Sequence, residues 1–360
     1  MDYKSKRVDR LRNLLTEAKI DALFVTAPEN RFYLSGFTGS DGSLLISREQ
    51  LVLFTDFRYL EQVKKESRDY AVIEVKSSYE DILAAFIREK KITSLGLDGE
   101  HLNYNRYLTF KNRLADIEVK EAGGLVEKLR LIKDDEEIGY ITEAVRIADQ
   151  AFANIVPKLS PGTTERQIAL ELEHTMKTMG ASATAFSIIV ASGARGALPH
   201  GVASDKPLEK QDMVTIDFGA VYRGYHSDIT RTVILGAPSQ KQQEIYRICL
   251  EAQTKAIEAV RSGVRAREVD KVARDIIESN GYGDCFGHGT GHGLGLNIHE
   301  KPKLSTKDDT VLEQGMTVTI EPGIYLPDWG GVRIEDTVLV EENGCKVLTK
   351  TPKMSLRNVL

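Results

Sequence analysis

The sequence predicts an α+β protein of two domains, and the second domain is built from two copies of one helix–helix–hairpin unit. Two matching stretches support this prediction, V-T-I-D-F-G at 214–219 and V-T-I-E-P-G at 318–323. Each stretch ends an apolar strand-like run on a carboxylate, and each is followed by a second carboxylate, Asp228 or Glu335. A pair of such hairpins could supply one half of a shared site from each copy.

The duplication extends upstream into two helical patterns of equal length. One pattern runs from Gly162 to Gly180 and the other from Gly263 to Gly281, so both close eighteen positions after they open. A glycine just past the last turn is a typical helix stop. Because two degenerate copies are too few for a solenoid, we expect a pseudo-twofold domain with its site at the junction of the copies.

The first part of the chain alternates short apolar strands with amphipathic helices, which predicts an α/β domain. The expected strands are Ala22–Thr26, Ser43–Ser47, Leu51–Thr55, Ala71–Val75, Ser94–Leu97 and Ile117–Glu121, and the expected helices lie near 4–19, 56–67, 79–91 and 103–115. We expect this domain over residues 1–125, a linker over 126–134 and the duplicated domain over 135–360. The acidic stretch 133–137 also suits the first turn of a long helix.

Composition excludes several classes of function. The chain has 360 residues, of which 41% are hydrophobic and 28% charged, as is ordinary for a globular protein. A net charge of −5 without a long basic run predicts no nucleic-acid partner. No apolar run approaches the roughly 18 residues of a membrane span, so we expect no membrane partner and a cytoplasmic location. Three scattered cysteines, Cys249, Cys285 and Cys345, predict reduced thiols.

Four carboxylates form the first part of a candidate site. Asp217 and Asp228 flank a short glycine-bounded connection, and Glu321 and Glu335 flank a turn rich in proline, aspartate and glycine. We expect each pair on antiparallel strands, with its two carboxylates facing one side of the sheet. Any one of them alone would more often be a surface acid or a strand-end cap. Their occurrence in two matched settings favours a common site.

A segment rich in glycine and histidine lies between the two copies. Residues 287–300 hold five glycines and three histidines, His288, His292 and His299. A helical zinc pair is disfavoured, because each interior glycine would destabilise a helix by about 1 kcal/mol. A phosphate cradle is also disfavoured, because no G-x-G-x-x-G follows a strand. His200, in L-P-H-G, is a fourth histidine in a bounded motif, although a lone histidine is more often a satisfied structural group.

Four carboxylates and one imidazole carry a charge of −4, which two divalent metal ions would neutralise. A ligand set rich in oxygen is typical of Mn²⁺ or Co²⁺, whereas structural zinc is typically held by thiolates. Zn²⁺ and Fe²⁺ are further options for this site. Two such ions activate water and polarise a carbonyl group, so the reaction implied is hydrolysis. Arg333 lies two residues before Glu335, and strand alternation directs it to the ligand face, where it could orient substrate or a ligand carboxylate.

Six blocks of the second domain resemble the proline-specific metallopeptidases of the pita-bread fold, namely aminopeptidase P and prolidase. These blocks are L-P-H-G at 198–201, D-F-G at 217–219, S-D-I-T-R-T at 227–232, H-G-T-G-H-G at 288–293, E-P-G at 321–323 and R-I-E-D at 333–336. The resemblance covers the chain from near residue 135 to its end. More weakly, residues 30–37 and 55–59 resemble the creatinase-type N-terminal domain.

The resemblance implies a role for each candidate residue. The implied metal ligands are Asp217, Asp228, His292, Glu321 and Glu335, with Asp228 and Glu335 bridging. It also implies that His200 and His299 bind substrate near the scissile bond, that His288 donates or accepts a hydrogen bond at the reacting centre, and that Glu321 carries a proton. It assigns no role to His226. This residue lies two positions before Asp228, so its side chain could point inward with that carboxylate, support the ligands from behind or face solvent.

The activity that the resemblance implies is that of aminopeptidase P, which releases the first residue from peptides with proline at the second position. The first alternative is prolidase, which cleaves Xaa-Pro dipeptides with the same machinery. A peptide-binding module that has lost its ligands, a metal-free creatinase and a methionine aminopeptidase are more distant alternatives. All five ligand positions are filled, which disfavours the first two of these. The resemblance also implies a homodimer.

Overall fold

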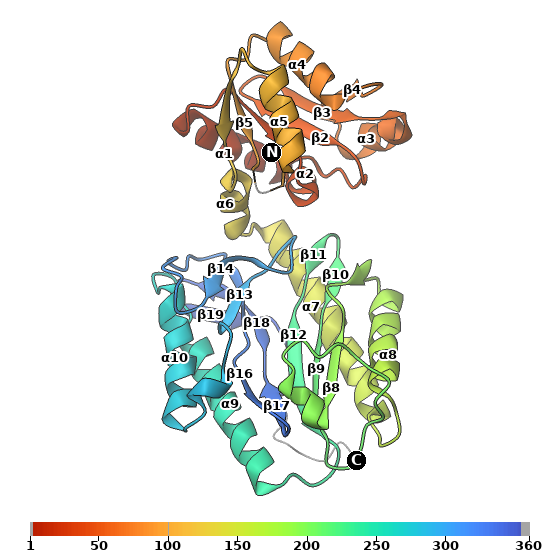
Figure 1. Ribbon diagram of the computed structural model, residues 1–360, viewed down its shortest axis with the longest axis vertical. Coiled ribbons are helices and arrows are strands. Elements are labelled where there is room, and N and C mark those ends of the chain that lie inside the picture. The colour runs from red at the N-terminus through yellow and green to blue at the C-terminus, as the bar shows by residue number, and fades with distance from the viewer. Residues whose placement is uncertain (1–2, 100, 354–360) are drawn as a thin grey trace. The chain divides into compact units, whose positions relative to one another are not determined.

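The computed structural model describes residues 3–99 and 101–353, and its chain divides after Arg130 into two compact units (Figure 1). Helix α6 (Leu125–Leu131) occupies most of the segment expected as a linker, 126–134. Its Val126 and Leu129 are buried, so this segment is packed helix rather than an extended connection.

The amino-terminal unit is built on a mixed six-stranded sheet with the strand order β4-β3-β2-β1-β5-β6. The strands are β1 (Ala22–Val25), β2 (Ser43–Ser47), β3 (Leu51–Thr55), β4 (Ala71–Glu74), β5 (Ser94–Leu97) and β6 (Glu118–Glu121). β2 pairs antiparallel with β1 and β3, while β5 pairs parallel with β1 and β6. Every strand expected from the apolar pattern is present, with ends that differ by one residue at most.

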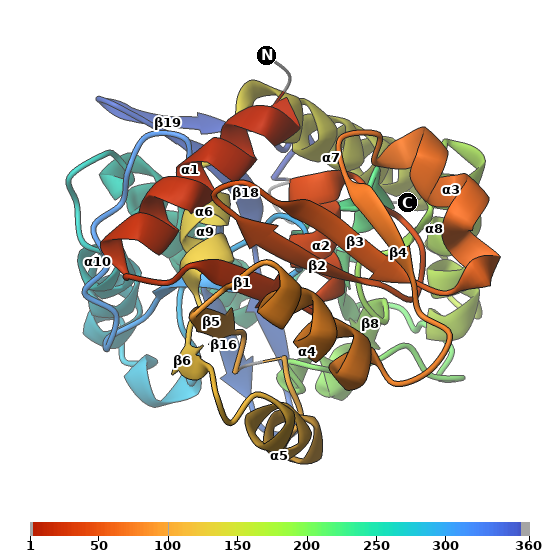
Figure 2. The same cartoon turned by 90° about the horizontal axis from the view of Figure 1, so that it is seen from above.

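Helices cover both faces of this sheet (Figure 2). They are α1 (Tyr3–Glu17), α2 (Pro28–Ser35), α3 (Leu60–Glu66), α4 (Tyr79–Glu89) and α5 (Tyr104–Arg113). Apolar residues of α4 and α5 pack with the inner strands, and Phe110 meets Phe24 edge to face at 5.4 Å. Helix α2 was not among the expected helices. Its Pro28 resembles a breaker in the sequence, yet proline suits the first turn, where its missing N–H has no partner to lose.

The second unit repeats a pair of helices. The first pair is α7 (Asp135–Ile155) and α8 (Glu165–Thr178), and the second is α9 (Gln240–Ala259) and α10 (Ala266–Ser279). The glycines that bound the shorter helix of each pair have matching left-handed backbones, with φ of 93° and 104° in the first copy and 88° and 85° in the second. The duplication predicted from the glycine spacing is therefore present in the backbone.

Each copy also contains a pair of antiparallel strands interrupted by a small hairpin. In the first copy β9 (Met213–Phe218) pairs with β12 (Ile229–Ile234) around the hairpin of β10 (Ala220–Tyr222) and β11 (Tyr225–His226). In the second copy β15 (Thr317–Ile320) pairs with β18 (Asp336–Glu341) around the hairpin of β16 (Gly323–Leu326) and β17 (Gly330–Arg333). The remaining strands are β7 (Ala183–Thr184), β8 (Ile189–Ser192), β13 (Gly291–Gly293), β14 (Glu300–Leu304) and β19 (Gly344–Val347).

Contrary to the expectation from the sequence, three of the four carboxylates do not lie on strands, because a small hairpin interrupts each strand pair. Asp217 lies on a strand as expected, but Asp228 and Glu335 each lie immediately before the returning strand, and Glu321 lies immediately after β15. The hairpin between the paired strands lets the chain turn away from the ladder. Asp228, Glu321 and Glu335 therefore stand where strand pairing ends, and their backbones are free of the regular two-residue alternation.

Each copy has its own hydrophobic core. One core joins α7 and α8 to β8, β9 and β12 and contains Phe152 stacked on Phe218 with centroids 6.1 Å apart. The other joins α9 and α10 to β15 and β18 and contains Val269, Val318 and Val338. The carboxylate-bearing strand ends lie between these two layers of helices (Figure 1). In the described part of the chain no helix has the length and apolarity to span a bilayer.

Candidate metal centre

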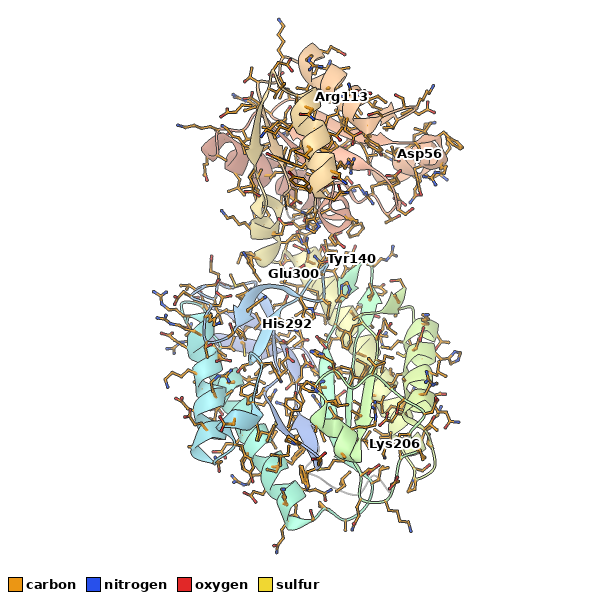
Figure 3. All side chains as sticks on the ribbon, in the orientation of Figure 1. Asp56, Arg113, Tyr140, Lys206, His292 and Glu300 are labelled. Atoms are coloured by element: carbon orange, nitrogen blue, oxygen red, sulfur yellow. The ribbon has the colours of Figure 1, made fainter. Side chains whose placement is uncertain are left out.

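The structure gathers the five predicted ligands from both copies. Asp217 is the penultimate residue of β9, Asp228 precedes β12, His292 is the middle residue of β13, and the two glutamates flank the β16–β17 hairpin. Ligand atoms of Asp228, His292 and Glu335 all lie within 4.8 Å of one another. Figure 3 marks His292 in the second unit. Residues more than a hundred positions apart thus form one cluster, and the set chosen from spacing is spatially contiguous.

Asp217 and Glu321 join this cluster through short contacts. Glu321 Oε1 lies 3.3 Å from His292 Nε2, and Asp228 Oδ2 lies 3.6 Å from the same nitrogen. Asp217 Oδ2 accepts a 2.6 Å hydrogen bond from Arg333 Nη2. Asp217 also repels the carboxylates of Asp228 and Glu335 electrostatically. Four carboxylates therefore face one small volume, with Arg333 as their cationic neighbour.

The orientation of His292 suits a metal ligand. Its Nδ1 lies 2.9 Å from the carbonyl of Gly293, which assigns the ring proton to Nδ1 and leaves the lone pair on Nε2. Burial lowers the pKa of His292, so the ring favours its neutral form. A neutral Nε2 that faces two carboxylates is repelled by both. A metal ion between them would turn that repulsion into coordination.

The buried carboxylates would also be stabilised by a nearby positive charge. Burial raises the pKa of Asp228 well above its usual range, and repulsion by Glu335 and Asp217 raises it further. Burial and repulsion by Glu321 and Asp217 do the same to the pKa of Glu335, and burial raises that of Glu321. Desolvated like charges at this spacing are costly without a countercharge.

Two oxygens of the cluster have no hydrogen-bond partner among the described residues. They are Asp217 Oδ1 and Glu335 Oε1, and both are buried. A buried acceptor without a donor costs about 1–3 kcal/mol. Each carboxylate keeps its other oxygen bonded, to Arg333 in one case and to Thr230 at 2.7 Å in the other. A carboxylate with one oxygen fixed and one without a partner can bind a metal ion through the second oxygen, so the residues present fit divalent metal ions.

Arg333 lies at the centre of a hydrogen-bonded chain toward His288. Its Nη2 binds Asp217, while its Nη1 donates to the hydroxyl of Tyr325 at 2.8 Å. The Tyr325 hydroxyl lies 2.9 Å from His288 Nε2, and His288 Nδ1 lies 2.8 Å from the carbonyl of Gly289. Burial raises the pKa of Tyr325 to about 12, so the hydroxyl keeps its proton and donates a hydrogen bond to His288 Nε2. Of the two roles considered for Arg333, the contact with Asp217 is the one that orients a candidate ligand carboxylate.

The sequence analysis did not find Tyr325 or Thr230 as site residues. Thr230 follows Asp228 by two positions, and its hydroxyl both donates to Glu335 and accepts from Arg333 Nε at 3.1 Å. Tyr325 follows Glu321 by four positions on β16. Their spacing from the ligands was the available signal, but only the paired register shows that they meet Arg333.

The other predicted histidines surround the ligand cluster. The ring of His299 lies 4.4 Å from that of His292, centroid to centroid, and burial lowers the pKa of both His299 and His288. His200 is exposed and close enough to repel charge on His288 and His299. Of the candidate catalytic histidines, His299 lies against His292, while His200 reaches the cluster only through its proximity to His288 and His299.

The glycine-rich segment approaches its neighbours closely, as expected. A side chain at Gly291 would overlap the backbone carbonyl of Thr319, so only glycine fits beside β15. Thr319 Oγ1 accepts the backbone N–H of His292 at 3.0 Å, which sets the height of the ligand on its strand. His226 contacts this segment too, because its Nδ1 lies 3.2 Å from the carbonyl of Gly295. It supports the segment rather than joining the ligands.

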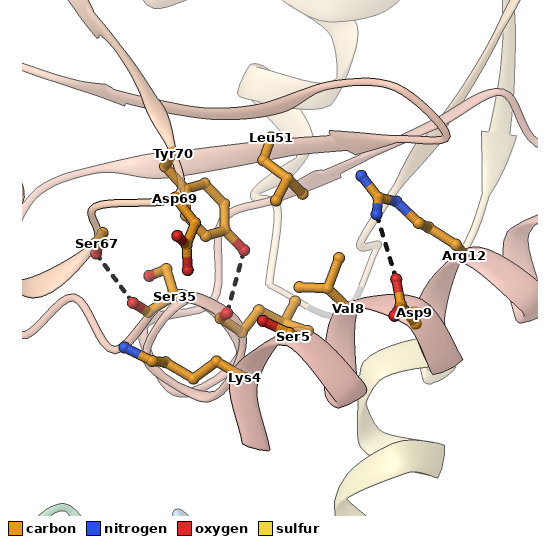
Figure 4. Close-up of a pocket in the computed structure, with 11 residues that line it drawn as sticks. Lys4, Ser5, Val8, Asp9, Arg12, Ser35, Leu51, Ser67, Asp69 and Tyr70 are labelled. Atoms are coloured by element: carbon orange, nitrogen blue, oxygen red, sulfur yellow. Dashed lines mark hydrogen bonds and ion pairs between the residues drawn. The ribbon is translucent and has the colours of Figure 1, made fainter. Parts of the chain in front are cut away.

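Two further features of the amino-terminal unit differ from this centre. Asp98, His101 and Glu127 form a second possible metal cluster, but the amide of Asn30 already donates to Glu127 at 2.6 Å. A hollow of about 200 Å³ is lined by α1, α2 and the segment 67–70 (Figure 4). It holds both acidic and basic side chains and contains none of the predicted site residues.

Comparison with known proteins identifies the family. The profile of metallopeptidase family M24 matches residues 139–342, and that of the creatinase/prolidase N-terminal domain matches residues 7–132. The chain belongs to metallopeptidase family M24. This confirms the resemblance and the fold class drawn from the sequence, a pita-bread domain preceded by a creatinase-type domain.

Individual members of the family match this chain over nearly its full length. An Xaa-Pro dipeptidase from Bacillus anthracis has a solved structure with a TM-score of 0.95 and 48% identity, covering 98% of this chain and 99% of that one. An Xaa-Pro dipeptidase of Pyrococcus furiosus is 44% identical over 97% of this chain and 99% of its own length. The structure of an X-Pro aminopeptidase from Thermotoga maritima has a TM-score of 0.90 and 40% identity, covering 97% of this chain and 99% of that one.

Proposed function

We propose that this M24 metallopeptidase is an Xaa-Pro dipeptidase that depends on two divalent metal ions. Aminopeptidase P was the first expectation from the sequence, with prolidase as its alternative. Several relatives similar over almost the whole chain are named Xaa-Pro dipeptidase or prolidase, which favours the alternative. The relative named X-Pro aminopeptidase keeps aminopeptidase P as the second candidate.

The observation that supports metal-dependent hydrolysis most strongly is the buried set of unpaired ligand atoms. Among the described residues, Asp217 Oδ1 and Glu335 Oε1 are buried without a hydrogen-bond partner, and His292 Nε2 lies 3.3 Å from Glu321 and 3.6 Å from Asp228. With Asp228 and Glu321 these residues would hold the ions. Divalent ions bound there would polarise the scissile carbonyl and lower the pKa of water.

The protein's own groups have distinct proposed tasks. Arg333 and Thr230 hold Asp217 and Glu335 in one orientation each. Tyr325 donates to His288 Nε2 and the carbonyl of Gly289 accepts from Nδ1, so the two contacts fix the orientation of the His288 ring. His200 and His299 are proposed to bind the peptide next to the ligands, and Glu321 to carry the proton to the leaving nitrogen. Mn²⁺ or Co²⁺ remains the expected metal, because four of the five ligands are carboxylates.

Proline selectivity has a physical basis in the substrate. An Xaa-Pro bond has no N–H, so a peptidase that binds that N–H cannot hold it. A site that acts on the carbonyl oxygen and on the chain ends does not need the N–H. This property suits both the dipeptidase and the aminopeptidase, which differ only in whether residues beyond the proline fit.

The test compares an Xaa-Pro dipeptide with an Xaa-Pro-Xaa tripeptide after chelation and after separate addition of Mn²⁺, Co²⁺ or Zn²⁺. We expect no turnover after chelation and recovery with one or more metals, with cleavage of the dipeptide alone. Cleavage of the tripeptide at a comparable kcat/KM would replace the dipeptidase by the aminopeptidase. Full activity in the metal-free protein would refute both.

A further inference from the structure

The segment that carries His200 is tied at both ends to one buried carboxylate. This segment, residues 192–204, leaves β8 through a 3₁₀ turn at Gly193–Ala197. The carboxylate belongs to Glu165, the first residue of α8, whose side chain is 0% exposed. Nothing in the sequence analysis singled out Glu165, which lies 35 positions before His200.

Each oxygen of Glu165 receives one end of the segment. Oε1 accepts hydrogen bonds from the backbone N–H and the hydroxyl of Ser192, at 2.8 and 2.9 Å. Oε2 accepts from the backbone N–H and the hydroxyl of Ser204, at 3.0 and 2.6 Å. Arg195 Nε lies 3.2 and 3.0 Å from the two oxygens. All five donor groups come from the segment, so the carboxylate closes it into a loop.

The surroundings of Glu165 favour its ionised form. Although burial works to raise the pKa of Glu165, hydrogen bonds from Ser204 and Ser192 hold it below its ordinary value. Arg195 supplies a countercharge, and the amino-terminal turn of α8 favours a negative charge at this position. Because all five donors point at acceptor oxygens, an uncharged amide in the same place would set its own N–H₂ against one of them.

The loop held in this way contacts the ligand cluster through its backbone. Pro199 O accepts from Arg333 Nη1 at 3.2 Å, and Arg195 Nη2 donates to Val202 O at 2.7 Å. His200 lies between these two carbonyls. Its ring makes no hydrogen bond or ion pair with any part of the chain that the structure describes, so the backbone of the loop sets its position.

We propose that Glu165 is a positioning residue that places His200 against the metal centre by closing the loop 192–204. The proposal rests on the proposed Xaa-Pro hydrolysis for its catalytic meaning. Glu165 touches neither a ligand nor the space where substrate would lie. We expect its effect on turnover to pass mainly through His200, with a smaller contribution from the Pro199 carbonyl that accepts from Arg333.

A double-mutant cycle tests the proposal with Glu165→Gln, His200→Ala and the combined variant, each saturated with metal and assayed on an Xaa-Pro dipeptide. We expect Glu165→Gln to lower kcat/KM by about 10–100-fold, because a displacement of about 1 Å at a reacting group has effects of this size. In the His200→Ala background the same substitution should cost less than about threefold. Equal losses in both backgrounds would overturn the proposal and leave Glu165 a purely structural residue.

Arg166→Ala is the matched control, because Arg166 is the next residue of α8 and pairs with Asp205 just beyond the loop. That pair is exposed, with Nε 2.6 Å from Asp205 Oδ1. We expect wild-type kcat/KM and metal content for this variant. A loss as large as that of Glu165→Gln would show that any disturbance near the loop suffices, and would overturn the specific role of the carboxylate.

Amide hydrogen exchange separates this proposal from the proposed function. In Glu165→Gln the amides of Ser192 and Ser204 should exchange faster, while those of β9 and β12 stay protected, whether or not the protein cleaves Xaa-Pro peptides. A wild-type protein inactive on both peptides would refute the proposed function alone. Unchanged exchange at both serines would refute the loop closure even in an active enzyme.

Discussion

The two copies of the duplicated unit share their backbone plan but differ in how they hold their functional side chains. Each copy has two helices, an interrupted strand pair and two carboxylates at matching places. The supports, however, cross between the copies. Arg333 of the second copy binds Asp217 of the first, and Thr230 of the first binds Glu335 of the second. Neither copy can orient its ligands alone, so the site is a property of the pair.

The segments that carry His200 and His288 are also held by different side chains in the two copies. In the first copy Glu165 accepts directly from the loop that carries His200. In the second copy Asp270 of α10 accepts from Thr290 and from Arg274, and Arg274 donates to the carbonyl of His288 at 2.8 Å. Both copies use a buried acid on the shorter helix, but at different positions of that helix. The common backbone persisted while the side chains that hold each segment diverged.

Removal of one ligand from either copy should have the largest effect and tests whether both copies are needed. We expect Asp228→Ala and Glu335→Ala to lose bound metal and turnover together, because each removes an anionic ligand from a buried shared site. Metal content by atomic emission and kcat/KM on an Xaa-Pro dipeptide measure this. Retention of turnover by a variant that binds no metal would break the shared-site description.

Substitution of Arg333, which holds Asp217, or of Thr230, which holds Glu335, should have an intermediate effect. We expect the two substitutions to have effects of similar size. Arg333→Lys cannot reach Asp217, Tyr325 and Thr230 at once, because an ammonium group lacks the planar fork. Thr230→Val removes the hydroxyl that meets Glu335 and Arg333. We expect losses of about 10–100-fold in metal affinity or kcat/KM, the usual range for residues that orient ligands. Titration of the metal-free variants with Mn²⁺ measures the first quantity.

Thr232→Val serves as the control for this pair of substitutions. Thr232 is on the same strand and face, and its hydroxyl meets the backbone of Arg333 rather than its side chain. Its metal affinity should stay within about threefold of wild type, since it touches no ligand. If Thr232→Val weakened metal binding as much as Thr230→Val, strand packing rather than ligand orientation would explain both.

The carboxylate of Asp270 should matter less for chemistry and more for stability. Asp270→Asn leaves Arg274 without its bidentate partner and weakens the bonds to Thr290, which are 3.0 and 2.9 Å long. We expect the free energy of unfolding to fall by about 1–3 kcal/mol, the cost of disrupting a buried hydrogen-bonded group. Chemical denaturation of the metal-loaded protein measures this. An unchanged denaturation midpoint would mean that the segment 286–290 is held by packing alone.

The sequence predicted the ligands better than their supports. Asp217, Asp228, Glu321 and Glu335 are visible because duplication repeats their local pattern. The residues that hold them meet partners about a hundred positions away, as Arg333 meets Asp217 and Thr230 meets Glu335. Such pairs depend on how two sheets pack, and local periodicity does not encode that. Helix α2 was missed for a different reason, because Pro28 resembles a break unless its position at the first turn is known.

The smallest predicted effect concerns pH and sharpens the contrast between the two buried acids. The folded protein holds the pKa of Glu165 below its ordinary value, because hydrogen bonds from Ser204 and Ser192 outweigh the opposing effect of burial. A depressed folded pKa contributes stability that is fully present above the unfolded pKa, about 4.3 for glutamate, and is lost as pH falls through the folded value. The stability difference between the wild type and Glu165→Gln should therefore be constant from pH 7 to pH 6 and shrink below about pH 4.

Denaturation of both proteins in the metal-free state across this range measures the difference, and metal-free samples remove the pH dependence of metal binding from the comparison. A difference that grows as pH falls would mean that Glu165 is protonated when folded, and the loop would then be closed by neutral hydrogen bonds rather than by a charge.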